Sequence, residues 1–146
     1  MSTYDWLLFL HLLGAVAVFA AIATYSAVLM EAGRPATAAS FLPLIRVGGV
    51  LFDVGGLLLI VFGIWLAFDA DYGLTDEWVV AALVMYAAAA YAGTRTRIRL
   101  LAARSAASDR PLRDAVREAR AVPMYLVMVV TVLVLLALMI FKPGAG

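Results

Sequence analysis

The chain has 146 residues, of which 66% are hydrophobic and only 14% are charged, and its formal net charge is +1. Typical soluble domains have about 45–50% apolar and about 25% charged residues, so this composition excludes an ordinary water-soluble fold and indicates a single membrane-embedded domain. Because there is no cysteine, disulfides, thiolate metal sites and cysteine nucleophiles are excluded as well.

Four apolar stretches stand out along the chain, at residues 4–30, 47–68, 78–93 and 123–141. Each matches or approaches the ~20 residues that cross a hydrocarbon core about 30 Å thick. The first has no Lys or Arg ahead of it, so we expect a retained helix rather than a signal peptide.

The helices are expected to extend beyond two of these stretches. The third stretch continues into a segment rich in Ala, Leu and Arg, which are good helix formers. Asp109 is expected to cap the fourth helix, with Pro111 in its first turn. We therefore predict an all-α protein, an antiparallel bundle of four transmembrane helices in one domain (residues 1–146), with helices over 4–30, 47–68, 78–107 and 110–141.

The basic residues fall almost entirely on one side of this bundle. The side formed by both termini and the second connection has only Lys142, together with several acidic residues. By the positive-inside rule, both termini then lie outside a cytoplasmic membrane, and Trp6 and Trp78 mark the outer interface. The first and third connections hold the other ten, which are Arg34, Arg46, Arg95, Arg97, Arg99, Arg104, Arg110, Arg113, Arg117 and Arg120.

The arginine-rich side is expected to contact the anionic head groups of the lipid bilayer. A nucleic-acid partner is not expected, since Asp109, Asp114 and Glu118 interrupt the basic run and no nucleic-acid-binding motif is present.

Asp53 is the most informative polar residue, because it lies inside the second apolar stretch, ~9 Å from the inner boundary. A carboxyl group at this depth costs a few kcal/mol, so it should face protein or water. It shares one side of its helix with Gly49, Gly56 and Gly63, which repeat every seven residues. Small residues allow close helix packing in lipid, so this glycine stripe predicts a tight helix contact or a seam between two copies.

The expected partners of Asp53 are found by depth. Thr131 of the fourth helix enters from the same side of the membrane, and Tyr25 lies near the end of the first helix, with no Lys or Arg inside 47–68. Two interpretations stay open. Asp53 is either a proton or cation site, or a hydrogen-bonded acid that stabilises the bundle.

His11 is the only histidine and lies ~8 Å below the outer interface, too far from Asp53 for a direct pair. Tyr86 is expected at a similar level and could be its hydrogen-bond partner. Met85 is expected there too, and a His/Met pair is a known set of axial ligands for haem. Two interpretations of His11 therefore stay open: a hydrogen-bonded residue of the bundle, or a ligand of a cofactor. The sequence does not identify a metal.

Three segments carry a family resemblance. They are WLLFLHLLGA at 6–15, GGLLLIVFGIWLA at 55–67 and FKP at 141–143. Together they resemble an uncharacterised bacterial family of predicted four-helix integral membrane proteins, similar in turn to copper-resistance-D-like and HemJ-type proteins. The resemblance implies that His11 matches a first-helix histidine tied to haem in the HemJ type. It implies no oxidase activity, since the third-helix lysine of that type has no counterpart in 78–93.

No catalytic motif is found in the sequence. We therefore expect a non-enzymatic intramembrane module for binding, transport or partnership, acting as a homo-oligomer. The alternatives are a haem-binding redox protein that uses His11 and a proton- or cation-conducting oligomer centred on Asp53.

Overall fold

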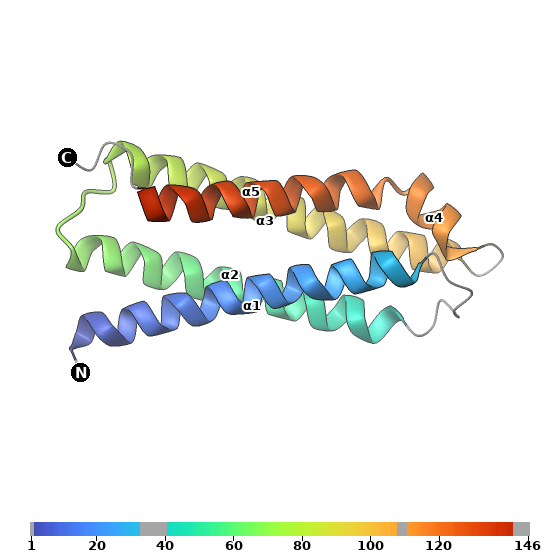
Figure 1. The fold of residues 1–146 in the computed structure, drawn as a ribbon, viewed down its shortest axis with the longest axis horizontal. Helices are drawn as coiled ribbons and strands as arrows, with labels where there is room; N and C mark the ends of the chain where they lie inside the picture. The colour runs from blue at the N-terminus through green and yellow to red at the C-terminus, as the bar shows by residue number, and fades with distance from the viewer. Residues whose placement is uncertain (1, 33–40, 108–110, 142–146) are drawn as a thin grey trace.

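The computed structural model describes residues 2–32, 41–107 and 111–141, which form five helices and, within these ranges, no strand. Four of them are long and apolar enough to cross a membrane. The predicted all-α bundle of four transmembrane helices is therefore confirmed. In chain order the helices are α1 (Thr3–Glu31), α2 (Phe41–Asp69), α3 (Glu77–Ala106), α4 (Leu112–Glu118) and α5 (Ala121–Phe141) (Figure 1).

α2 begins six residues earlier than the apolar pattern predicts, at Phe41 rather than at residue 47. The pattern marks only the part of a helix that needs an apolar surface, and a helix can continue past it. Pro43 is tolerated there because it lies in the first turn, where its missing N–H has no helical partner. Arg46, expected in the connection, therefore lies inside α2. α1 and α3 differ from the expected bounds by one residue at each end.

The prediction of a single helix over 110–141 is wrong, because the helix is interrupted between α4, which ends at Glu118, and α5, which begins at Ala121. Arg120 has a left-handed backbone with φ 52°. The cause is Pro123, whose ring would clash with the carbonyl group of Ala119 if the helix continued. Arg99 Nη1 donates to the carbonyl oxygen of Arg120 at 2.8 Å and satisfies an acceptor at the break. Pro111 is the N-cap residue of α4, and Asp109 lies outside the described residues.

The spanning helices form two hairpins, α1 with α2 and α3 with α5, and contacts within each hairpin are more extensive than those between them. Figure 1 shows the hairpins close together at the end of the molecule where α4 lies, which we call the α4 end. They separate toward the opposite end, which holds the start of α1 and which we call the amino-terminal end.

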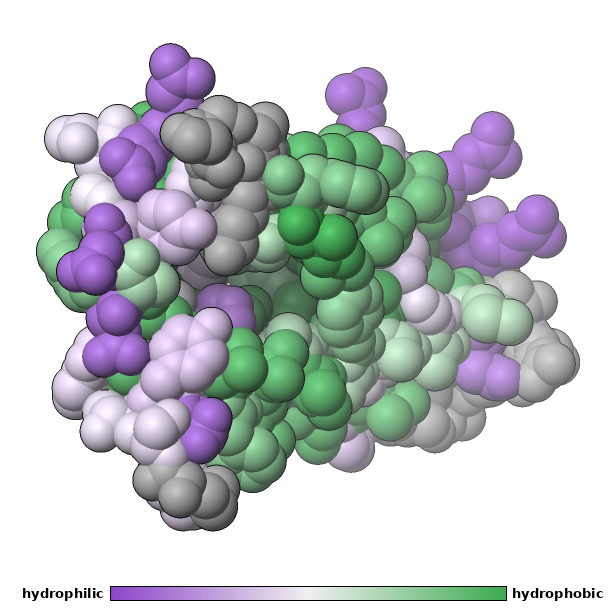
Figure 2. Space-filling model, turned by 60° about the vertical axis from the view of Figure 1, so that its left-hand side comes forward, coloured by the Kyte–Doolittle hydropathy of each residue, from purple (hydrophilic) through white to green (hydrophobic). Residues whose placement is uncertain are grey.

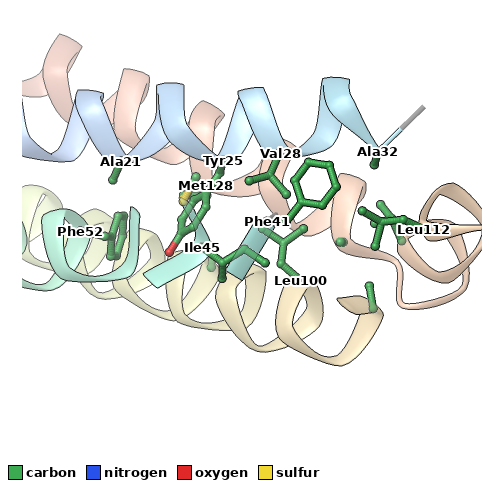
Figure 3. Close-up of a cluster of buried hydrophobic side chains, with 14 of the residues drawn as sticks. Ala21, Tyr25, Val28, Ala32, Phe41, Ile45, Phe52, Leu100, Leu112 and Met128 are labelled. Carbon is green, nitrogen blue, oxygen red and sulfur yellow. The ribbon is translucent and has the colours of Figure 1, made fainter. Parts of the chain in front are cut away.

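The hydrophobic core occupies the α4 end. Its largest fully buried side chains include Tyr25, Ile45, Leu100 and Met128, one from each spanning helix. Figure 3 shows these side chains between the helices, with Leu112 of α4 covering that end of the core. The fold is therefore tightly packed at the α4 end, whereas the hairpins separate toward the amino-terminal end (Figure 1).

The outward surfaces of the spanning helices are apolar, as lipid contact requires. Large exposed side chains on them include Val16, Val50, Val84 and Leu133. In Figure 2, hydrophobic residues cover the middle of the molecule and hydrophilic residues gather toward both ends. This distribution matches a helix bundle that spans a bilayer.

Candidate binding site between the helix hairpins

A cavity of about 410 Å³ lies where the hairpins separate, toward the amino-terminal end. All four spanning helices contribute to it, and a hollow between hydrophobic surfaces is visible on the face drawn in Figure 2. Most of the lining is aliphatic, and among the described residues that line it there is no Asp, Glu, Lys or Arg. Its polar groups come from His11, Tyr4, Tyr72, Trp78 and Tyr86. A large apolar cavity with a few polar groups is typical of a site for a small molecule.

His11 lies in this cavity in a defined orientation. Its Nδ1 is 3.1 Å from the carbonyl oxygen of Leu59 on α2. A carbonyl oxygen can only accept, so Nδ1 carries the proton and Nε2 of the neutral ring keeps its lone pair. A histidine held through one nitrogen by a carbonyl group presents the other nitrogen as an acceptor or a metal ligand.

Gly63 makes room for this contact. A Cβ atom at position 63 would lie 3.0 Å from Cε1 and 3.2 Å from Nδ1 of His11. Any larger residue would therefore press on the imidazole ring where it reaches the Leu59 carbonyl group. In the sequence, Gly63 is a visible sign that a side chain can approach α2 closely at this point. The sequence does not indicate that the Leu59 carbonyl group is the acceptor.

Tyr86 lines the same cavity, but the expected hydrogen bond between Tyr86 and His11 is not formed. Its hydroxyl group donates instead to the carbonyl oxygen of Gly56, at 2.9 Å. Met85 is absent from the cavity lining in the described chain, whereas Met139 of α5 is present. The reason is helical geometry, because neighbouring residues differ in direction by about 100° and Tyr86 already faces the cavity.

The predicted glycine stripe faces other helices of the same chain, but it does not bring two backbones together. Each of its glycines faces a polar side chain: Gly49 that of Arg97, Gly56 that of Tyr86, and Gly63 that of His11. The stripe therefore makes space for polar side chains that reach α2. The expected close backbone contact occurs elsewhere, between Gly14 and Gly55, which the sequence reasoning did not pair.

Asp53 forms an ion pair that the sequence analysis did not predict. Its Oδ2 atom is 2.5 Å from Nη1 of Arg97 on α3, and the two side chains are 54% and 32% exposed. The second apolar stretch contains no basic residue, but this does not leave Asp53 without a basic partner. The partner comes from the arginine-containing part of α3 that follows the third apolar stretch. The long arginine side chain passes Gly49 to reach the carboxylate.

The two expected partners of Asp53 have different positions. Thr131 is buried, and its hydroxyl group donates to the carbonyl oxygen of Val127 in its own helix, at 2.7 Å, so the predicted Asp53–Thr131 hydrogen bond is replaced by the ion pair. Tyr25 is buried and packs against Gly48 of α2.

The described residues contain no group of three or more His, Cys, Asp or Glu side chains that could hold a metal ion. His11 is the one residue of these four types among the described residues that line the cavity.

Fold and cavity together define a polytopic integral membrane protein with four spanning helices and an apolar site between its hairpins. Residues 5–143 match the model of a family described as predicted integral membrane protein (DUF2269). The chain belongs to this family. No curated protein and no solved structure matches the chain.

Proposed function

We propose that the protein binds a largely apolar, uncharged molecule inside the membrane, in the cavity between its hairpins. The observation that carries the proposal is the fixed imidazole of His11 in a cavity of about 410 Å³ lined without charged residues in the described chain. An uncharged lining disfavours a charged ligand, because a charge removed from water needs a partner.

His11 supplies the polar contact in this proposal. With Nδ1 bound to the Leu59 carbonyl group, Nε2 accepts a hydrogen bond from an O–H or N–H group of the ligand. One neutral hydrogen bond contributes about 0.5–1.5 kcal/mol, which corresponds to roughly a two- to tenfold gain in affinity. The ligand class is thus an uncharged lipophilic molecule that carries a hydroxyl or amide N–H group.

A matched pair of probes tests this class. The phenol 4-nonylphenol and its methyl ether have similar apolar bodies, but only the phenol can donate a hydrogen bond. Trp78 lines the cavity, so quenching or shift of its fluorescence reports binding when Trp6 and Trp65 are replaced by Phe. We expect the phenol to bind more tightly than the ether, and the two to bind equally to His11→Phe.

A third variant separates the ligand contact from the fold. His11→Asn keeps an N–H near the position of Nδ1 and loses Nε2, so it should retain thermal stability while losing the preference for the phenol. Equal binding of phenol and ether to the wild-type protein would contradict the proposed role of His11. No binding of either probe would contradict the proposed site.

Haem binding is the second candidate, because His11 has the orientation of a metal ligand and Met139 lines the same cavity. The resemblance of the first-helix segment to HemJ-type proteins points the same way. His11 would hold the haem through Nε2, and the haem would supply redox chemistry. The described lining offers no cation for the two haem propionates, which favours the uncharged ligand. A Soret band that shifts in His11→Phe would instead support haem.

For Asp53 we propose a structural role rather than conduction, since its carboxylate is paired with Arg97. Flux of protons or cations through liposomes, present in the wild type and lost in Asp53→Asn, would overturn this assignment. Transport of the ligand, a partner protein and a homo-oligomer are further proposals. The size of the detergent-solubilised protein tests the homo-oligomer. The glycine stripe is not proposed as the contact between copies, because its three glycines face side chains of the same chain.

A further inference from the structure

A second, smaller cavity of about 260 Å³ lies between α2 and α3. Its inner wall includes Val18 of α1 and Val132 of α5, so it reaches the middle of the bundle. Three residues of its lining, Asp53, Leu57 and Thr94, are exposed. The cavity is therefore a groove that opens sideways between α2 and α3 onto the surface that faces lipid.

Most of the groove lining is apolar, and its polar side chains are those of Asp53, Tyr86 and Thr94. Asp53 itself lines the groove, and Arg97 follows Thr94 by about one helical turn. Asp53 is sixteen residues before the end of α2 at Asp69, a distance of ~24 Å along the helix, while the hydrocarbon core is about 30 Å thick. The pair thus meets lipid near the boundary between acyl chains and head groups.

An exposed ion pair at this level needs contact with polar groups, because charges are costly in hydrocarbon. A phospholipid can supply these polar groups with its head group and can occupy the groove with an acyl chain. Its acyl chain suits the apolar groove. Its phosphate suits the guanidinium group of Arg97, which has five N–H donors on three nitrogens and uses Nη1 to contact Asp53. An ammonium group suits the carboxylate, so an ion pair complements a zwitterionic head group.

We propose that the groove between α2 and α3 binds one phospholipid of the phosphatidylethanolamine type. Arg97 holds the phosphate, Asp53 attracts the ammonium group, and an acyl chain lies along Leu57 and Ala90. This inference goes beyond the proposed function, since it concerns the groove that opens between α2 and α3 and does not involve His11. The groove adjoins the larger cavity, and the residues that line both are Val18, Leu59, Tyr86, Val132 and Leu135.

Blocking the groove tests whether lipid binds in it. Ala90 lines the groove and is half-buried, whereas Ala87 lies on the same helix and is exposed. After incubation with vesicles of equal parts phosphatidylethanolamine and phosphatidylglycerol, then detergent extraction, native mass spectrometry counts the lipids retained per protein. We expect Ala90→Trp to lose most of the retained lipid and the control Ala87→Trp to keep it. Equal retention by the wild type and a folded Ala90→Trp would overturn the proposal.

Two further variants complete the test. If Ala90→Trp fails to fold, Thr94→Phe narrows the mouth of the groove from an exposed position and should lower retention several-fold. Asp53→Asn removes the attraction for the ammonium group and leaves Arg97, so the retained lipid should change from phosphatidylethanolamine toward phosphatidylglycerol. An unchanged lipid preference in Asp53→Asn would overturn the assignment of the head group. His11→Phe should not affect either result, so failure here is distinguishable from failure of the proposed function.

Discussion

Gly14 of α1 and Gly55 of α2 lie directly opposite each other, and the two helix backbones pack closely there. A Cβ atom on Gly14 would be 2.8 Å from the carbonyl oxygen of Gly55, and a Cβ atom on Gly55 would be 2.8 Å from that of Gly14. The contact is therefore reciprocal and involves two backbones, which cannot move aside as a side chain can. Close approach of this kind is a main source of helix association in lipid.

Replacing Gly55 with Ala should separate α1 from α2 at this point. We expect a loss of about 1–3 kcal/mol in the free energy of unfolding, the usual effect of overpacking. Stepwise unfolding in sodium dodecyl sulfate, followed by circular dichroism, measures it. Gly56→Ala is the matched control, since its Cβ atom would meet the Tyr86 side chain, with the hydroxyl oxygen at 3.3 Å, and no backbone atom. A similar loss in both variants would show that the backbone contact is not the cause.

The break between α4 and α5 makes a prediction about Arg120. Its left-handed backbone, with φ 52°, costs roughly 1–2 kcal/mol for a residue with a Cβ atom and little for glycine. Arg120→Gly should therefore be more stable to unfolding than Arg120→Ala, by about 1 kcal/mol. Both variants remove the same charge, so their difference in melting temperature reports the backbone alone. Greater stability of Arg120→Ala would mean that the helix is continuous there.

The amino-acid sequence predicts the spans well because hydropathy is a property of each segment. It predicts their ends less well, since α2 extends past the apolar region to Phe41. The break at Arg120 had a visible signal in Pro123, whose ring is incompatible with a helix that continues through residue 119.

The contacts of the site were less accessible to sequence reasoning. The acceptor for His11 is the backbone of Leu59, and a backbone group leaves no mark in a sequence. The partner of Asp53 is Arg97, which lies 44 residues away and which the count of basic residues places in the third connection, on the arginine-rich side. The cavity arises because two hairpins separate at one end, and this depends on their relative packing rather than on any single helix.

The asymmetry of basic residues predicts the orientation in the membrane, which labelling of single cysteines can measure. The chain has no cysteine of its own. Thr75, in the connection between α2 and α3, and Ser105, near the end of α3, are both exposed. By the positive-inside rule, Thr75→Cys should react with an impermeant maleimide in intact cells, and Ser105→Cys only after lysis. The reverse pattern would place both termini in the cytoplasm.

The ion pair between Asp53 and Arg97 predicts coupling between two substitutions on different hairpins. Asp53→Asn leaves Arg97 charged without its partner, and Arg97→Gln leaves Asp53 in the same state. Hydrogen bonds to charged groups contribute about 1.5–3 kcal/mol when buried, and partial exposure lowers this, so each single variant should lose about 0.5–2 kcal/mol.

The double variant removes both charges, so its loss should be smaller than the sum of the two single losses. This difference, the coupling energy of the double-mutant cycle, isolates the pair from other effects of each substitution. Arg46→Gln is the control for loss of a basic residue, because Arg46 is exposed on α2 at the α4 end, and it should change stability little. Additive losses would show that Asp53 and Arg97 do not stabilise each other, and the contact between the hairpins would then depend on the packing of the core at the α4 end.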